Sequence, residues 1–566
     1  MGSCLFRAIV FRNQWITIVT EVRKMPGGVP NCDTCHKPMK RARGLYYCET
    51  GQDDLHKNAL CDRLMKEGID GRPDVDVVAR TGQLTDLAVQ FGRKDGLACV
   101  LAWYEVLDQK TFRGELAIPL DYIRAIAIAG KRYGTEWQWD QATLAREIFH
   151  LRRAVSHKDF TRMPEVFRCQ CLNNLGNRLK VAGRAVEALD CWRRTLEIQP
   201  KFGMSLCNRA IVLVNYGLAL EDEEDKALFL WLAHKEASAA IARTAIYTDI
   251  HDEVTRRKTK ELKDWIESAL DIKGIAATGV DPLAAQDASA TAEERDHRHW
   301  CLVNCLYLNP LNDLGRYTVA MADSTGLATH VVPVDAPHIF ASFFDQMKQE
   351  YASARWLLYE GLTMKMPHFS DRDVFLQATE PRPSLSLAIE KVKTAYRISY
   401  SLFDKIGFFL NAYMELGIPA KKVSFRTLWR TGENQPLRRQ FDSTSNWGFC
   451  ALYWLAKDLF EKENDEVAEP EARGLSDIRN HLEHKYLRVT VAESPTAPPG
   501  DLAFMVSREQ FEGKAMHLLK LARSALVYLA IGVGFEERRR AAEPSRAAEP
   551  VEELPLTSYL PDAEKI

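Results

Sequence analysis

The sequence predicts an all-α protein in two parts, an array of helical repeats followed by a helical bundle. Apolar residues recur with a helical period from about residue 75 to residue 270, with few of the alternations that strands require. Within this region, the stretch 172–200 has the spacing of two antiparallel helices. Beyond residue 380, the apolar stretches are long enough for buried helices, which favours a bundle.

The overall composition is that of a soluble globular chain, and it sets limits on function. A chain of 566 residues is too long for one core and suggests three or four domains. Lys and Arg number 75 against 77 Asp and Glu, so the net charge of −2 provides no global attraction to nucleic acid. Any contact with a polyanion must therefore come from a local patch. No uninterrupted apolar run reaches the length of a membrane span.

The first 24 residues are an N-terminal extension of uncertain status. Arg7 and Arg12 interrupt its apolar character, so it is a poor signal peptide, and Met25 offers a second start. The 13 cysteines are odd in number and mostly scattered in helix-like segments. This usage predicts free thiols in a reducing cytoplasm rather than a disulfide framework.

Residues 25–74 hold one cluster of cysteines, which suggests a structural zinc knuckle. A C-x-x-C turn supplies two thiolates at a separation that suits tetrahedral zinc, but the second half of the cluster lacks such a turn. His36 and His56 are alternative ligands. Two interpretations stay open, a scaffolding zinc site or unrelated free thiols. The four candidate ligands are Cys32, Cys35, Cys48 and Cys61.

Residues 75–271 are predicted to form tetratricopeptide-like helical repeats. Small residues at Gly176 and Ala188 let two helices approach closely, Trp192 fills the space between them, and Pro200 ends the second helix. The stretch 206–217 looks like the first helix of a following repeat. Repeats are stable only when stacked, so we expect degenerate neighbours on both sides. The alternative is a plain helical hairpin.

A linker is predicted at 272–295, which is rich in Ala, Gly, Asp, Ser and Thr. A second helical domain follows over 296–540, and the Pro/Glu-rich tail 541–566 is predicted to be disordered. The expected helices of this second domain lie at 344–361, 382–419, 447–460 and 513–540, and one more starts in 476–487. The chain contains none of the G-x-G-x-x-G, P-loop, G-x-S-x-G or H-E-x-x-H patterns, so those enzyme classes have no support.

The candidate catalytic cluster is "SDIRNHLEHKYL", residues 476–487. With Ser476 or Asp477 as the N-cap, Arg479 falls in the first turn. Asn480 and His484 are four residues apart and share one face, whereas Arg479 lies about 140° around the helix from His484. A partner chain across a two-fold axis could complete the set.

This set of residue types suits metal-independent cleavage of RNA. A histidine can move protons near neutral pH, and an arginine presents a permanently charged fork to phosphate oxygens. In this interpretation His484 is the acid/base group, Arg479 stabilises the phosphate and the transition state, and Asn480 orients them. The alternative is a solvated helix face on which Arg479 and Glu483 form an ordinary ion pair.

The segment "IRNHLEHKY" resembles the motif of the HEPN superfamily of helical ribonucleases, with Arg479, Asn480 and His484 as the matching positions. The segments 395–418 and 308–315 resemble a bacterial branch in which a large HEPN domain follows tetratricopeptide-like repeats. The resemblance implies a dimeric bundle that cuts RNA without a metal cofactor in toxin, anti-phage or stress responses. The repeats would then sense a trigger or bind a protein partner.

Two further features of the second domain bear on the predicted site. Asp404 and Lys405 either line the cleft or form an internal ion pair. The basic segment 425–440 carries Trp429, which could stack a base, although such segments are more often solvated loops.

Two other functions compete with the ribonuclease hypothesis. One is a non-enzymatic adaptor that dimerises and binds protein partners through its repeats. The other is nucleotide binding or transfer by the bundle, which ranks lowest because no suitably spaced carboxylates are present for a metal.

Overall fold

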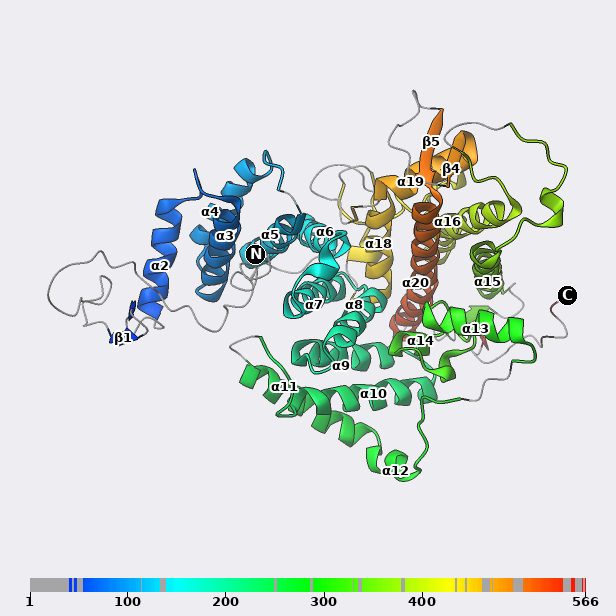
Figure 1. Cartoon of the computed structure of the whole chain (residues 1–566). Coiled ribbons are helices and arrows are strands. Elements are labelled where there is room, and N and C mark those ends of the chain that lie inside the picture. The colour runs from blue at the N-terminus through cyan, green and yellow to red at the C-terminus, as the bar shows by residue number, and fades with distance from the viewer. Residues whose placement is uncertain are drawn as a thin grey trace.

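The protein is helical almost throughout, which confirms the predicted all-α class (Figure 1). The structure is a computed structural model and describes residues 40–42, 45–47, 551–554, 562, 565 and most of 54–542. Within 54–542 the described chain has gaps at 113, 133–138, 249–251, 286–288, 329, 334–337, 378–381, 433–434, 443–444, 461–468, 471 and 492–501.

The first part of the chain is a row of helical hairpins that runs from the left of Figure 1 to its centre. Successive helices pack as the pairs α3–α4, α5–α6, α7–α8 and α9–α10, and we call this row the array. Its helices are α2 (Asp54–Glu67), α3 (Asp74–Gln90), α4 (Lys94–Leu107), α5 (Ala117–Arg132), α6 (Ala142–Ser156), α7 (Glu165–Val181), α8 (Ala185–Ile198), α9 (Gly203–Gly217) and α10 (Glu223–Ile241).

The hairpin predicted at 172–200 is formed by α7 and α8, and its packing follows the expected logic. A Cβ atom added to Gly176 would lie 2.6 Å from the Trp192 indole nitrogen, so only glycine permits this approach. Ala188 and Trp192 are fully buried. The next hairpin places Ala210 in the core, at its predicted small position. The array is thus a stack of hairpins, while its assignment to the tetratricopeptide family stays a prediction.

The segment predicted as a linker is partly ordered against the rest of the molecule. After α11 (Asp252–Ala269) the chain forms the short helix α12 (Ile272–Ala277). Leu283, which follows it, is 1% exposed and belongs to the main hydrophobic core. The composition of 272–295 signalled a connection but not this anchoring contact.

The second part of the chain is a bundle around α20, which stands upright in Figure 1. α15 and α20 extend beyond the predicted ranges, α16 is shorter than its predicted range at both ends, and α18 has the predicted bounds. The helices are α13 (Ala292–Val303), α14 (Leu311–Leu314), α15 (Ile339–Thr363), α16 (Leu387–Tyr413), α17 (Arg439–Asp442), α18 (Trp447–Phe460), α19 (Ala472–His484) and α20 (Arg508–Ala541). Among the described residues there are also five 3₁₀ turns: η1 (Gly114–Leu116), η2 (Phe160–Arg162), η3 (Thr318–Ala320), η4 (Phe369–Asp371) and η5 (Ala420–Lys422).

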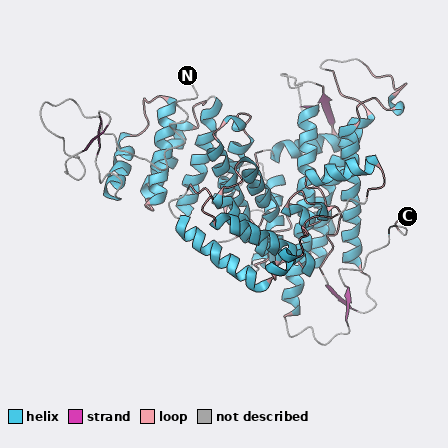
Figure 2. Cartoon of the chain, turned by 60° about the horizontal axis from the view of Figure 1, so that its bottom comes forward, coloured by secondary structure: helices cyan, strands magenta, loops and turns pink. Residues whose placement is uncertain are grey.

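The part of the chain that the structure describes has three short two-stranded ladders, which lie at the edges of the helical body (Figure 2). Two are antiparallel and one is parallel: β1 (Lys40–Ala42) with β2 (Leu45–Tyr47), β3 (His330–Pro333) with β6 (Val551–Leu554), and β4 (Tyr486–Thr490) with β5 (Ala503–Ser507). The β6 strand belongs to the tail for which the sequence predicted disorder. The β4–β5 pair connects α19 to α20, so it fixes the end of the helix that carries the candidate site.

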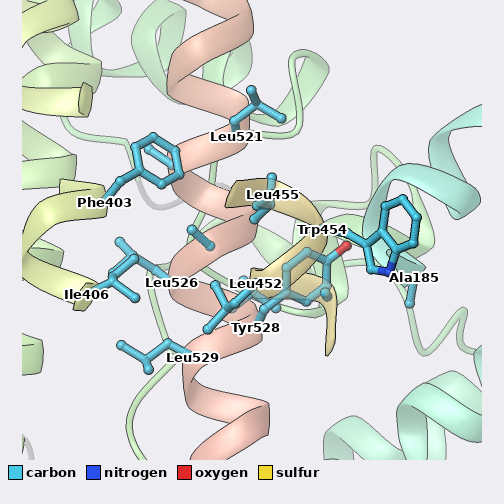
Figure 3. Packing of buried hydrophobic residues seen from close by; sticks show 14 of the residues in the cluster. Ala185, Phe403, Ile406, Leu452, Trp454, Leu455, Leu521, Leu526, Tyr528 and Leu529 are labelled. Atoms are coloured by element: carbon cyan, nitrogen blue, oxygen red, sulfur yellow. The ribbon is translucent and has the colours of Figure 1, made fainter. Parts of the chain in front are cut away.

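Helix α20 is the buried centre of the bundle. It is the one described helix that is long and apolar enough to span a membrane, and 89% of its most apolar window is buried inside the protein. Side chains of α16 and α18 pack against those of α20, and Trp454 of α18 extends toward Ala185 of the array (Figure 3). Where α18 crosses α20, a Cβ on Gly448 would lie 2.6 Å from the Gly532 amide nitrogen.

The array and the bundle share this core and are joined by buried ion pairs. The Asp458 carboxylate on α18 is 1% exposed and accepts two hydrogen bonds from Arg152, at 2.7 and 2.9 Å. It also accepts one from Arg184 at 2.5 Å. Burial raises the pKa of Asp458, but the two guanidinium groups outweigh burial and hold it below its usual range. The two parts therefore pack as one body across this junction.

The glycine crossing of α18 and α20 makes a prediction about stability. Gly448→Ala should lower the free energy of unfolding by about 1–3 kcal/mol, because the new methyl group meets backbone that cannot move aside. Gly513→Ala is the matched control, since a Cβ there has no neighbour within 4 Å. It should stabilise the protein by about 0.5–1 kcal/mol through helix propensity. Urea unfolding measures both, and effects of the same sign would contradict the close crossing.

Candidate functional site

The helix that carries the candidate residues, α19, is anchored to α16 through its apolar face. Leu475, Ile478 and Leu482 are buried. Tyr396 of α16 donates a hydrogen bond to the Leu475 carbonyl at 2.6 Å, and Arg397 donates one to the Leu482 carbonyl, also at 2.6 Å. Contacts at both ends of the buried face thus hold α19 in a fixed rotation about its axis.

The predicted helix start at Ser476 or Asp477 is wrong, because α19 begins at Ala472. The apolar face already includes Leu475, and its burial extends the helix upstream of the capping residues that the sequence suggested. Arg479 consequently lies beyond the first turn and cannot benefit from the helix N-terminus. Any role of Arg479 must come from the groups that pack beside it.

Arg479 is half-buried and faces α16. Its guanidinium carbon lies 5.4 Å from the centre of the Tyr400 ring, within the range of a cation–π contact. Burial raises the pKa of Tyr400 to about 12, and the nearby Arg479 charge partly opposes this shift. Burial likewise raises the pKa of Asp404, again opposed by Arg479. Arg479, Tyr400 and Asp404 therefore form one electrostatic group on the α16–α19 surface.

The other two predicted residues lie differently. Asn480 is half-buried, whereas His484, the last residue of α19, is exposed to solvent. Arg479 and His484 are five residues apart, which separates them by about 7.5 Å along the axis and about 140° around it. A single chain thus presents the phosphate-binding candidate and the proton-transfer candidate on different sides of one helix.

The neighbouring charged residues of α19 have local structural contacts. Glu483 forms an ion pair with Arg397 of α16 at 3.5 Å, so the expected surface pair with Arg479 is replaced by one between helices. The His481 Nδ1 atom lies 2.7 Å from the Asp477 carbonyl oxygen, and its ring packs 5.5 Å from the centre of the Phe504 ring. These contacts give His481 a place in the packing between α19 and β5.

Trp429, in the basic segment 425–440, is buried in the core, which corrects the suggestion that its ring stacks a base. Trp429 is 1% exposed and donates its indole hydrogen bond to the Phe425 carbonyl at 2.8 Å. Arg430 pairs with Asp140 of the array. The proposed internal pair of Asp404 and Lys405 is also replaced, since Lys405 pairs with Glu350 of α15 while Asp404 lies near Arg479.

Comparison with protein families identifies the bundle. Residues 332–536 match the family model described as LA2681-like HEPN, a range that contains α15 to most of α20 and the whole of α19. This part of the chain is a HEPN domain. Neither the curated proteins nor the solved structures include a significant match to the chain. The match lies inside the range 296–540 that the sequence predicted for this domain.

The candidate zinc site upstream of the HEPN domain falls mostly outside the described residues, where Cys32, Cys35 and Cys48 lie. Cys61 is described, and its thiol is fully buried in the apolar core that α2 forms with α3 and α4. Burial raises the pKa of this thiol, which favours its neutral form. Among the described residues, no group of three His, Cys, Asp or Glu side chains is arranged to hold a metal.

Sequence analysis missed Tyr400 as a neighbour of the candidate site in the HEPN domain. Tyr400 and Asp404 are four residues apart on α16, so their shared helix face was visible in the sequence. The sequence did not show how α19 is rotated about its axis, and this rotation turns Arg479 toward the α16 face that carries Tyr400 and Asp404. A tyrosine and an aspartate one helical turn apart are the signal that could have found them.

The raised pKa of Asp404 predicts a pH-dependent change in stability. When folding raises the pKa of a carboxyl group, the folded state loses stability relative to the unfolded state as the pH rises above the ordinary pKa of the group. The full loss is reached above the raised pKa of the folded state. Asp404→Asn should therefore raise the free energy of unfolding at pH 7. The gain should be below about 1 kcal/mol because solvent screens a half-buried charge, and it should shrink toward pH 4.

Thermal or urea unfolding at several pH values tests this expectation. Asp345→Asn is the matched control, because Asp345 is an exposed carboxylate on the neighbouring α15. Its effect should stay within about 0.5 kcal/mol at every pH. A loss of stability in Asp404→Asn at pH 7 would show that the Arg479 attraction exceeds the cost of burial.

Proposed function

We propose that the protein is a metal-independent endoribonuclease of the HEPN type. The observation that carries this proposal is the HEPN family match over 332–536, because one helix of that domain carries Arg479, Asn480 and His484. The polar surface that Arg479 forms with Tyr400 and Asp404 supports it. Perturbed titratable groups gather at functional sites more often than elsewhere.

The chemistry assigns a separate task to each residue. His484 takes the proton from a ribose 2′-hydroxyl, whose oxygen then attacks the adjacent phosphorus while the 5′-oxygen leaves. Arg479 stabilises the negative charge that builds on the phosphoryl oxygens. Asn480 orients the imidazole or the phosphate. The proton that the leaving oxygen needs would come from a second imidazole, which we assign to His484 of a second chain.

A homodimer would supply the missing group. Because Arg479 and His484 lie on different sides of α19, two copies in a two-fold arrangement could place the arginine of one opposite the histidine of the other. An exposed apolar surface beside this region supports such pairing. The segment 364–376 leads toward residues 382–384, which pair with the chain at the end of β4. Its most exposed apolar side chains are Met366, Phe369, Val374, Phe375 and Leu376, and Tyr486 and Leu502 add to them from the β4–β5 ladder.

The array would then regulate the nuclease. We assign it the sensing of a trigger or the binding of a protein partner, in a cytoplasmic toxin, anti-phage or stress response. Tight packing of the array on α18 supports this role, because an event on α6 or α8 reaches the HEPN core directly through Asp458.

A non-enzymatic adaptor is the competing function, and one observation favours it. His484 is exposed in the single chain, and the cavities next to α8 and α10 are lined by other residues. An adaptor would need its bundle only for dimerisation. In that case, substitution of the motif residues would leave its cellular effect unchanged.

Cleavage of RNA by the purified full-length protein distinguishes the two functions. Wild type should degrade total RNA in the presence of EDTA, and Arg479→Ala or His484→Ala should reduce the rate at least about 100-fold, the usual range for a lost acid/base or charge-stabilising group. His481→Asn is the control, since an asparagine amide can replace the Nδ1 hydrogen bond to the Asp477 carbonyl. It should cleave at close to the wild-type rate.

The same variants can be compared in cells. Overexpression of wild type should arrest growth, and either Arg479→Ala or His484→Ala should relieve the arrest. If wild type and the His484→Ala protein leave RNA equally intact and neither is toxic, the adaptor function is favoured and the catalytic assignment fails.

Dimerisation through the apolar segment gives a second test. Phe375 is 94% exposed, so Phe375→Asp leaves the core unchanged while placing a charge in the proposed interface. Sedimentation should show a dimer for wild type and a monomer for Phe375→Asp, with loss of RNA cleavage. Val280→Asp alters an exposed apolar residue of the distant α12 region and should stay dimeric. A wild-type monomer that still cleaves RNA would contradict the shared site.

A further inference from the structure

A cavity of about 430 Å³ lies at the junction of the array and the HEPN domain. The array forms one side with residues of α6, α7 and α8, and α20 of the HEPN domain forms the other. Its volume falls within the range of pockets that enclose small organic ligands. It is separate from α19, because none of the residues of the candidate ribonuclease site lines it.

The cavity wall carries an excess of positive charge. Six Arg and Lys side chains line it against four Asp and Glu side chains. Most of the arginines are held in ion pairs, such as Arg193 with Asp190 and Arg523 with Asp313. Within the part of the chain that the structure describes, Arg194 and Lys520 form no ion pair, although both lie near enough to the Asp190 carboxylate to lower its pKa.

Two groups of the cavity wall, Arg184 and Asp190, point to the same chemistry. Arg184 is 1% exposed, and its Nε atom has no hydrogen-bond partner among the described residues. A buried donor of this kind is costly unless a ligand or water satisfies it. Burial raises the pKa of Asp190, but Arg193, Arg194 and Lys520 together hold it below its usual value. This shift reflects the positive potential at the cavity.

The rest of the wall is apolar. Leu175, Leu179 and Leu189 of the array face Leu521 of α20 across the space. A bare inorganic anion would leave these side chains without a partner, whereas an uncharged apolar molecule would leave the Arg184 Nε donor unsatisfied and give Arg194 and Lys520 no counter-charge. A ligand with an apolar body and one anionic end satisfies both parts of the wall.

We propose that this cavity binds a small amphipathic organic anion, an apolar body that carries a phosphate, sulfonate or carboxylate group. The anionic end lies toward Arg194 and Lys520, and the apolar body lies among the leucines. The ligand contacts both the array and α20, so its binding stabilises the junction of the two parts. This site does not depend on the ribonuclease proposal, because binding can be measured without RNA.

The dye 8-anilinonaphthalene-1-sulfonate is a suitable probe, because it joins an aromatic body to one anionic group and fluoresces when bound. Titration of the full-length native protein should reveal one saturable site. Arg194→Met should weaken its binding at least about 10-fold, since it removes the charge but keeps the apolar stem. Ser156→Trp, at the exposed end of α6 where it borders the cavity, should block binding by steric filling.

The matched control is Arg257→Met on α11, an exposed arginine remote from the cavity whose side chain is 69% exposed. It should bind the dye as wild type does. Competition by adenosine monophosphate or by decanoate then separates a planar base from an aliphatic chain as the apolar body, and displacement by either supports the proposal. Equal displacement by inorganic phosphate alone, or dye binding that neither cavity variant changes, would overturn it.

Discussion

The Asp458 carboxylate is the group on which the arrangement of the two parts depends. It lies on α18, the most apolar helix of the bundle. It accepts hydrogen bonds from the guanidinium groups of Arg152 on α6 and of Arg184, which directly precedes α8, so two successive hairpins of the array contact it. A buried charge without partners would cost several kcal/mol, and loss of one member of such a group typically costs about 3–5 kcal/mol. The three charges therefore require the array to meet α18 at this place. A shifted register would leave at least one charge buried and unpaired.

Close helix packing carries this constraint to the candidate site. Gly183 approaches the backbone of α18 at the array boundary, and Gly448 of α18 approaches the backbone of α20. Helices in contact at glycines are fixed in both distance and rotation, because no side chain separates them. The α16 helix packs on α20, and α19 packs on α16 and α18. The direction in which Arg479 points is thus set through a chain of contacts that begins at the array.

The sequence was informative where neighbours along the chain decide the structure. Gly176, Ala188 and Trp192 meet within one hairpin, so their spacing alone predicted the close contact. The bounds of α18 also followed from the chain, since an apolar run of that length admits few alternatives. The start of α19 was wrong, because burial of Leu475 against α16 outweighs the capping preference of Ser476. The Trp429 interpretation failed for a similar reason, since a loop rich in arginine can still bury its aromatic ring when a distant carboxylate, here Asp140, pairs with the arginine.

The separation of Arg479 and His484 has a consequence for how such a domain can be controlled. Each chain holds its arginine against α16 in an electrostatic group that burial and packing stabilise, while its histidine extends into solvent. Under the proposed function, catalysis by the pair would require two chains to meet in one orientation, while the array shares its hydrophobic core with the bundle. If the proposed nuclease function holds, a single chain would be inactive without any inhibitory segment. Its activity would then depend on assembly, and a ligand at the array–bundle junction would act on that assembly rather than on the reacting groups.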